Sequence, residues 1–177
     1  MPLTEALGQI KETNMHEIKW SGENKHAFNL NILNYEYPEK GASDGHDAEW
    51  LNLSVSASNS LGSWSNTAPC LLTWELVWFR RWLYNVVDGN IESNEVTFLE
   101  PELKIVFLSA TPGWYHFSVV LNYGLSRSSE HQPNVLHLQI SERDHSLALE
   151  VIDKAIVAFP SRTSMGKSNE KLGPKLL

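Results

Sequence analysis

The sequence predicts an α+β domain, in which a predominantly antiparallel β-sheet of about six to seven strands carries two helices on one face. Three observations predict this class. Apolar and polar residues alternate in several short segments, two longer segments carry apolar residues at helical spacing, and consecutive strand candidates are joined by short connections. No regular alternation of strands and helices requires a parallel sheet.

The strand candidates are marked by a period of two residues. In residues 26–35 and 51–58 the apolar side chains are separated by Asn and Ser, which is typical of strands buried on one face. Residues 35–47 form a loop, because Pro and Gly interrupt the alternation there. The expected strands are, in order, 26–35, 51–58, a short strand around Trp64, 95–99, 102–109, 114–123 and 135–140.

Two segments carry the helical period instead. The first begins near Thr73, which we expect to be the N-cap, with Glu75 in the first turn, where it favours the helix dipole. The second begins after Ser141, a predicted N-cap with Asp144 three residues later, and Pro160 ends it. We expect Leu147 to lie on the apolar face of this second helix.

A chain of 177 residues is the usual size of one domain. We expect a flexible N-terminal segment over residues 1–15 and a single α+β domain over residues 16–160. Residues 161–177 contain four basic residues, one acidic residue and few large apolar ones, which predicts a disordered basic tail.

The composition indicates a cytoplasmic protein. No stretch reaches the roughly 18 apolar residues of a transmembrane helix, and the N-terminus lacks the pattern of a signal peptide. The single cysteine, Cys70, excludes an internal disulfide and fits a reducing compartment. The net charge of −7 argues against nucleic acid as a partner and suits a basic protein. The same charge is also compatible with a role in solubility alone.

The sequence predicts no catalytic site, no cofactor and no metal. It contains no nucleotide-binding, zinc-protease or hydrolase motif. Cys70 stands in an apolar run and is expected to be a buried structural thiol. His116 and His137, on neighbouring expected strands, and His131, in the loop between them, could be considered as metal ligands, but solvent-facing histidines are the favoured explanation because no carboxylate or thiol has the spacing to complete a site.

Acidic residues gather in the loop between the first two strand candidates. Five of them fall within fourteen residues, and they do not have the spacing of a calcium loop: Glu36, Glu39, Asp44, Asp47 and Glu49. We interpret this loop as a binding surface for a basic partner, with Tyr37 or Trp50 as an aromatic contact. Asp88, Glu92 and Glu95, beyond the first helix, are expected to support it. The alternative is that Asp47 caps a turn, Trp50 belongs to the core and the other acids are simply solvated.

The chain also resembles a known family through an ordered set of short motifs. The matching pieces are Leu30-x-Ile32, Tyr35-Glu36-x-Pro38, Asp47-Ala48-x-Trp50-Leu51-x-Leu53, Thr73-x-Glu75-Leu76-x-x-Phe79-x-x-x-Leu83, Phe98-x-Glu100-Pro101-x-Leu103 and Phe159-Pro160. On these residues, about 17 to 160, the sequence is similar to the WapI-type immunity proteins, the inhibitors of bacterial contact-dependent toxins. The strand candidate 135–140 departs from the pattern, as do both terminal extensions.

The resemblance implies a non-enzymatic immunity protein that binds and neutralises the C-terminal domain of a cognate toxin. Toxins of this class are often basic nucleases, which an acidic inhibitor would attract. A second hypothesis is a module that binds a sugar or nucleotide in a pocket lined by Trp64, Trp74 and Trp114, and a third is an accessory or structural protein. The sequence leaves open whether the protein is a monomer or a homodimer.

Overall fold

The strands pair in two separate sheets, and the helices stand together beside them. The computed structural model describes residues 16–90, 93–127 and 132–172. It confirms the antiparallel α+β class and differs from the sequence expectation in detail. Within these described residues, eight strands form two four-stranded sheets, in the orders β1-β2-β3-β4 and β5-β6-β7-β8, where one sheet of six to seven strands was expected.

The elements follow the chain in the order strands, helix, strands, helix. The strands are β1 (Glu17–Ser21), β2 (Ala27–Tyr35), β3 (Trp50–Asn59), β4 (Gly62–Leu72), β5 (Glu95–Thr97), β6 (Leu103–Thr111), β7 (Trp114–Leu121) and β8 (Asn134–Ser141). The helices are α1 (Thr73–Val86), α2 (Glu142–Ala158) and α3 (Ser164–Asn169), with short 3-10 turns η1 (Gly45–Ala48) and η2 (Tyr123–Leu125).

The period-two pattern determines which face of each strand is buried. The alternating apolar residues at 28, 30 and 32 in β2 and at 51, 53, 55 and 57 in β3 are buried, while the Asn and Ser residues between them are more exposed. β1 is a strand that the sequence analysis missed, because it is only five residues long and its alternation rests on Ile18 and Trp20. β4 is also longer than the short strand expected around Trp64.

The two sheets approach each other where β1 lies beside β8. The backbone N–H of His137 donates a hydrogen bond to Nδ1 of His26 at 2.8 Å. At Gly22 a Cβ atom would lie 2.1 Å from the backbone oxygen of His137, so no larger residue fits without moving the sheets apart. Glycine is therefore required here for close approach rather than for an unusual backbone angle.

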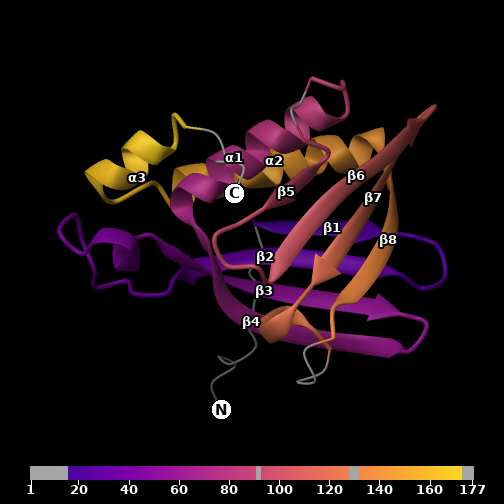
Figure 1. Cartoon of the computed structure of the whole chain (residues 1–177), viewed down its shortest axis with the longest axis horizontal. Coiled ribbons are helices and arrows are strands. Elements are labelled where there is room, and N and C mark those ends of the chain that lie inside the picture. The colour runs from indigo at the N-terminus through magenta and orange to yellow at the C-terminus, as the bar shows by residue number, and fades with distance from the viewer. Residues whose placement is uncertain (1–15, 91–92, 128–131, 173–177) are drawn as a thin grey trace, which may run out of the picture.

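Helices α1 and α2 run side by side and cover the space between the two sheets (Figure 1). A bidentate ion pair joins them, from Arg80 to Asp153 at 3.0 and 3.2 Å. Aromatic rings of α1 fill the interior, where Phe79 packs on Phe98 and Trp82 packs on Phe117. Both sheets and both long helices thus share one apolar core.

The helix ends agree in part with the sequence. Ser141 is the N-cap of α2, as predicted, and its Oγ accepts a hydrogen bond from the N–H of Asp144 at 3.1 Å. The predicted N-cap of α1 is wrong by one residue: Leu72 is the N-cap, and Thr73 is the first helical residue. Leu147 is 44% exposed, whereas its neighbours His145 and Ala148 are buried, so α2 faces the core slightly differently than expected.

The C-terminal segment differs most from the expectation. The sequence predicts disorder from Ser161 onward, but Ser161 and Thr163 are buried and Thr163 caps helix α3. Polar contacts with the rest of the protein order this segment, and a low content of large apolar residues does not predict such contacts. The residues expected to be flexible at the N-terminus, 1–15, lie outside the described residues, as do 173–177.

Candidate functional site: an acidic loop held by the C-terminal segment

The acidic loop comprises residues 36–49 and connects β2 to β3 at one end of the molecule (Figure 1). Its base is closed by a hydrogen bond from the N–H of Glu36 to the oxygen of Trp50 at 2.9 Å. Inside the loop, turns are closed from Lys40 to Tyr37 at 3.1 Å and from Asp44 to Gly41 at 3.0 Å. The loop is therefore folded on itself, with η1 as its last turn.

Three of its carboxylates are close enough to an exposed tyrosine to raise its pKa. Tyr37 is 37% exposed, and the pKa of its phenol is raised, first by the negative charge of Glu36, then by desolvation and by Asp47 and Glu39. Glu39 and Asp47 are exposed and Glu36 is half-buried. We call Glu36, Tyr37, Glu39 and Asp47 the Tyr37 surface. It combines an aromatic ring with concentrated negative charge, a combination that suits a Lys or Arg side chain.

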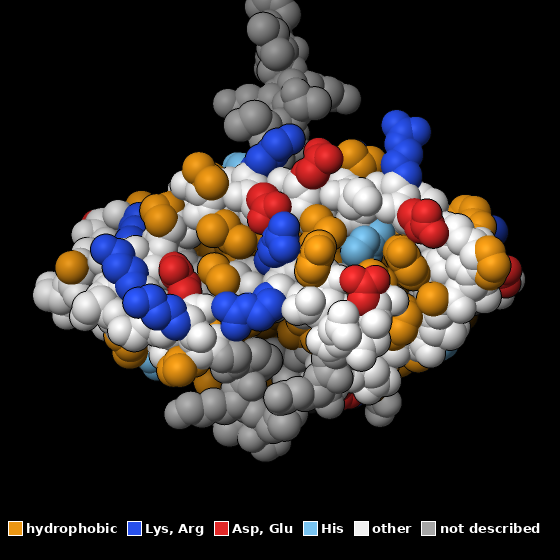
Figure 2. All heavy atoms as spheres, turned by 90° about the horizontal axis from the view of Figure 1, so that it is seen from above, with side chains coloured by type: hydrophobic (Ala, Val, Ile, Leu, Met, Phe, Trp, Pro, Cys, Tyr) orange, Lys and Arg blue, Asp and Glu red, His pale blue; other side chains and the backbone are white. Residues whose placement is uncertain are grey.

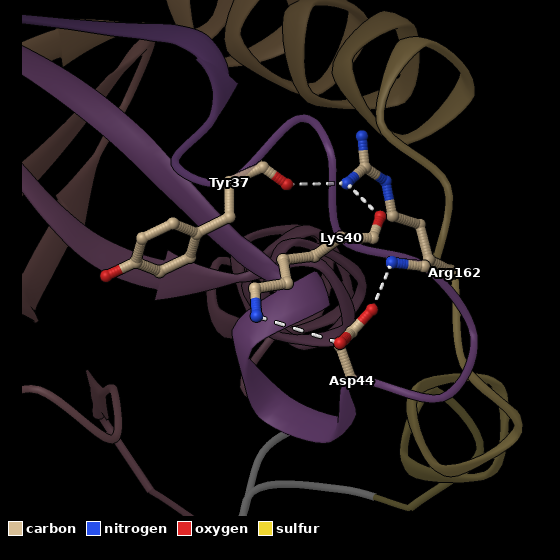
Figure 3. A network of polar contacts seen from close by, with 5 residues as sticks. Tyr37, Lys40, Asp44 and Arg162 are labelled. Carbon is tan, nitrogen blue, oxygen red and sulfur yellow. Dashed lines mark hydrogen bonds and ion pairs between the residues drawn. The ribbon is translucent and has the colours of Figure 1, made fainter.

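Asp44 serves the loop itself. Its Oδ2 accepts a hydrogen bond from the N–H of Gly41 at 2.7 Å, and its Oδ1 lies 3.7 Å from Nζ of Lys40 (Figure 3). Both contacts are local, and the residue stabilises the turn between 40 and 44. A contribution of Asp44 to partner binding would come in addition to this role.

Glu49 is fully buried and belongs to the interior. Its Oε1 accepts hydrogen bonds from the N–H of Thr163 at 2.7 Å, Oγ1 of Thr163 at 2.6 Å and the N–H of Arg162 at 3.0 Å. Its Oε2 accepts a hydrogen bond from Oγ1 of Thr73. The expectation that Glu49 forms part of the contact surface is wrong for this conformation, because the side chain is 0% exposed and its oxygens already have partners.

Arg162 holds the other side of the loop. Its Nη1 donates to the backbone oxygens of Tyr37 and Lys40, both at 3.0 Å, as Figure 3 shows. Its Cζ lies 3.3 Å from the centre of the Tyr35 ring, and the Tyr35 hydroxyl donates to the oxygen of Pro160 at 2.6 Å. The C-terminal segment is thus attached to the loop through backbone, charge and ring contacts.

A second buried glutamate fixes the start of α1. Glu75 accepts hydrogen bonds from the N–H of Leu72 at 2.9 Å and of Leu99 at 2.7 Å. Burial raises its pKa to about 7, and these two hydrogen bonds oppose the shift. Both contacts are to backbone groups, so the residue connects α1 to the segment after β5 and is not placed to act on a substrate.

The acids predicted to support the loop lie elsewhere. Asp88 follows the C-terminus of α1, whose N-terminus contacts the loop, and a helix of 14 residues spans about 20 Å. Glu95 is on β5 and lies 3.7 Å from Lys104. Glu92 lies outside the described residues. The length of α1 therefore separates Asp88 from the loop.

Basic side chains gather on a different face. Seen from above the helices, Lys and Arg are concentrated in the half of the molecule that contains α3 (Figure 2). Exposed Arg81, Lys167 and Lys171 belong to this region. This basic region lies at the same end of the molecule as the acidic loop, which is below α3 in Figure 1.

The structure does not assemble the alternative sites. Trp64 donates its Nε1–H to Leu125, Trp74 is buried against His46, and Trp114 stands exposed at the start of β7. In the described part of the chain, no ring contact joins any two of these tryptophans. The aromatic pocket is therefore not formed by these residues.

The histidines that were considered as metal ligands are not assembled into a site either. His116 and His137 lie on one face of the sheet, opposite Gln139 and Ser118 respectively, while His131 is outside the described residues. Over residues 16–90, 93–127 and 132–172, no group of three His, Cys, Asp or Glu side chains is arranged to hold a metal. Cys70 is buried, as predicted, and burial raises the pKa of its thiol.

Sequence reasoning missed the residues that hold the loop: Arg162, Thr163 and Thr73. Thr73 had a signal, since it belongs to the quoted motif, but it was assigned to a helix cap. Arg162 and Thr163 had none, because a polar segment after a Pro has the same sequence pattern whether or not it is attached to the rest of the protein.

Among the described helices, none is long and apolar enough to cross a membrane.

Comparison with known proteins gives one family. The model of the immunity protein WapI-like family matches residues 18–160. No curated protein matches the chain. Among solved structures, the plant transcriptional regulator PBF-2 is similar, with 7% identity, 81% of each chain covered and a TM-score of 0.38. That likeness is too distant to bear on function.

Proposed function

The chain belongs to the immunity protein WapI-like family, and on this basis we propose that it binds and neutralises a cognate bacterial toxin by protein–protein contact. The partner is the C-terminal toxin domain of a contact-dependent or polymorphic toxin. The protein acts in the cytoplasm of the producing cell and without catalysis. The observation that supports this proposal best is the family match over most of the chain.

We propose further that the toxin domain is basic and that the Tyr37 surface receives it. Electrostatic attraction to an acidic surface accelerates association, and a nuclease would present the complementary basic surface that normally holds phosphates. Tyr37 can contact a basic side chain through its ring while Glu36, Glu39 and Asp47 neutralise the charge. Asp44 and Glu49 contribute by holding the loop.

The first experiment is capture of the C-terminal fragment of the large polypeptide encoded immediately upstream. We expect one-to-one binding, and rescue of cells that express the fragment. A folded and toxic fragment that neither binds nor is neutralised would overturn the proposal of immunity to that toxin.

The contact surface is tested by two matched triple variants. Glu36→Gln/Glu39→Gln/Asp47→Asn removes three charges from the Tyr37 surface, and Asp88→Asn/Glu95→Gln/Glu150→Gln removes three exposed charges elsewhere. We expect the first variant to slow association at least tenfold and to weaken its salt dependence, with a much smaller effect for the second. Equal effects of the two variants would mean that only net charge matters. A larger effect of the second would move the contact surface to the Asp88 region.

A further inference from the structure

The segment that holds the acidic loop lies beyond the family match. The match ends at residue 160, and the contacts with the loop come from residues 161–172, which we call the C-terminal strap. The strap is attached to α1 as well, because Trp78 donates to the oxygen of Asn169 at 2.9 Å and Arg81 donates to that of Glu170 at 2.9 Å. The strap is therefore held at both ends, by the loop near its start and by α1 near its end.

Within the strap, Arg162 bears directly on the shape of the loop. A single nitrogen, Nη1, reaches the oxygens of Tyr37 and Lys40, which are the first and last residues of one loop turn. The Cζ atom of the same guanidinium lies 3.3 Å from the centre of the Tyr35 ring. A planar guanidinium can do both at once, whereas a lysine ammonium on a flexible stem cannot.

The turn that Arg162 contacts, residues 37–40, carries part of the Tyr37 surface, while Asp47 lies in η1. Tyr37 and Glu39 lie within the turn, and Glu36 immediately precedes it. Without the guanidinium, the oxygen of Lys40 would turn to water and the oxygen of Tyr37 would keep only the hydrogen bond from the N–H of Lys40. The loop would then adopt several conformations. Each conformation would present the phenol and the carboxylates differently.

We propose that Arg162 is a positioning residue that determines specificity: it holds the acidic loop in one conformation, and the toxin recognises that conformation. This inference rests on the proposed function. Arg162 acts through the backbone oxygens of Tyr37 and Lys40 and need not touch the partner. Since the strap lies outside the family match, the loop shape in this chain is set by residues that the family pattern does not specify.

The test uses the full chain in three variants, Arg162→Ala, Arg162→Lys and the control Lys167→Ala, which removes an exposed cation from α3. Hydrogen exchange is followed at the amides of Lys40 and Asp44, which close the loop turns, and at core amides of β3. Binding kinetics are measured with the upstream toxin fragment. Hydrogen exchange needs no partner, so it is independent of the proposed function.

We expect Arg162→Ala to speed exchange at Lys40 and Asp44 at least tenfold, with β3 unchanged, and to weaken binding about tenfold, because only a fraction of molecules then holds the competent loop. Arg162→Lys should fall between Arg162→Ala and the wild type in both measurements, and Lys167→Ala should match the wild type. Unchanged loop exchange in Arg162→Ala would overturn the positioning role. Faster exchange with unchanged binding would overturn the link to specificity. If the wild-type protein fails to bind the fragment, the proposed function fails, while the exchange result still decides whether Arg162 holds the loop.

Discussion

Thr163 donates two hydrogen bonds to the same oxygen of Glu49, from its N–H at 2.7 Å and from its Oγ1 at 2.6 Å, across 114 residues of sequence. The contact joins the end of the acidic loop to the segment that caps α3. Because Glu49 is fully buried, its oxygens have no access to water and depend on these partners.

Replacing Glu49 by Gln should destabilise the protein although the two side chains have the same shape. An amide offers one acceptor oxygen where Glu49 uses both, so either the donors on Oε1 or the Thr73 hydroxyl on Oε2 meets an NH₂ group. We expect a loss of about 3 kcal/mol in the free energy of unfolding, measured by urea denaturation. Glu39→Gln, on the exposed loop, should change stability by less than about 0.5 kcal/mol. Similar losses in both variants would argue against the buried network.

Gly166→Ala should reverse the usual effect of removing a helical glycine. In an open helix the change stabilises by roughly 1 kcal/mol. Here the new Cβ would lie 2.5 Å from Oε1 of Glu49 and 3.0 Å from Cβ of Ser161. We expect a loss of about 1–3 kcal/mol in a thermal or urea melt. Gly41→Ala, where nothing lies within 4 Å, is the matched control.

Glu75 should make the protein less stable as the pH rises. Burial raises its folded pKa from 4.5 to about 7, so between these values the folded state binds more protons than the unfolded state. By linkage, stability then falls from about pH 4.5 to pH 7, by an amount on the order of 3 kcal/mol. Urea denaturation at several pH values measures this slope.

The comparison with Glu75→Gln isolates the effect. His145 acts in the opposite direction, because burial lowers its pKa and stability therefore rises as it loses its proton. Both proteins contain His145, so the difference between their pH profiles reports Glu75 alone. A constant difference across pH 4.5–7 would contradict the raised pKa.

Ser141→Ala should weaken the start of α2. The Oγ of Ser141 accepts from the N–H of Asp144 at 3.1 Å, which is the usual N-cap contact. We expect a loss of about 1 kcal/mol, and a smaller one for Ser141→Asn, which can also cap and adds no negative charge beside the Asp144 carboxylate. Circular dichroism during thermal unfolding gives both values. If Ser141→Asn is as unstable as Ser141→Ala, the cap is not the source of the loss.

Cys70 should not react with thiol reagents in the folded protein. Its side chain is buried, so a reagent cannot reach it. Burial also raises the pKa of the thiol, so little of the reactive thiolate is present. At pH 8 we expect labelling by a chromogenic disulfide to proceed at the rate of unfolding, and to become fast in urea. Rapid labelling of the native protein would show that the segment around Cys70 opens locally.

Much of the fold could be predicted because its signals are local. The alternation in β2 and β3 depends only on neighbouring residues, and the Ser141 cap depends on a spacing of three. The strand count was too low because β1 offers only two buried residues as a pattern. The division into two sheets could not be predicted, since the approach at Gly22 and His137 joins segments that are far apart in the sequence.

The sequence predicted which loop forms the candidate site, but not which of its side chains are exposed or what holds them. The density of carboxylates identified residues 36–49, but charge alone does not distinguish exposed Glu39 from buried Glu49. Asp88 was grouped with the loop, but it follows the C-terminus of α1, about 20 Å from the helix end that contacts the loop. Arg162 was assigned to a disordered tail. It donates to backbone oxygens, and because every residue has one, the sequence does not indicate which oxygens it will contact.

The sequence by itself determined the antiparallel α+β class, the faces of β2 and β3 and the helix start at Ser141. It also determined the family, whose motifs lie in order along the chain. Only the tertiary structure decided which acids face water, how the C-terminal strap closes on the loop and where Arg162 acts. The physical reason is range: periodicity and capping act over a few residues, while burial of Glu49 and its contact with Thr163 exist only after distant segments have packed together.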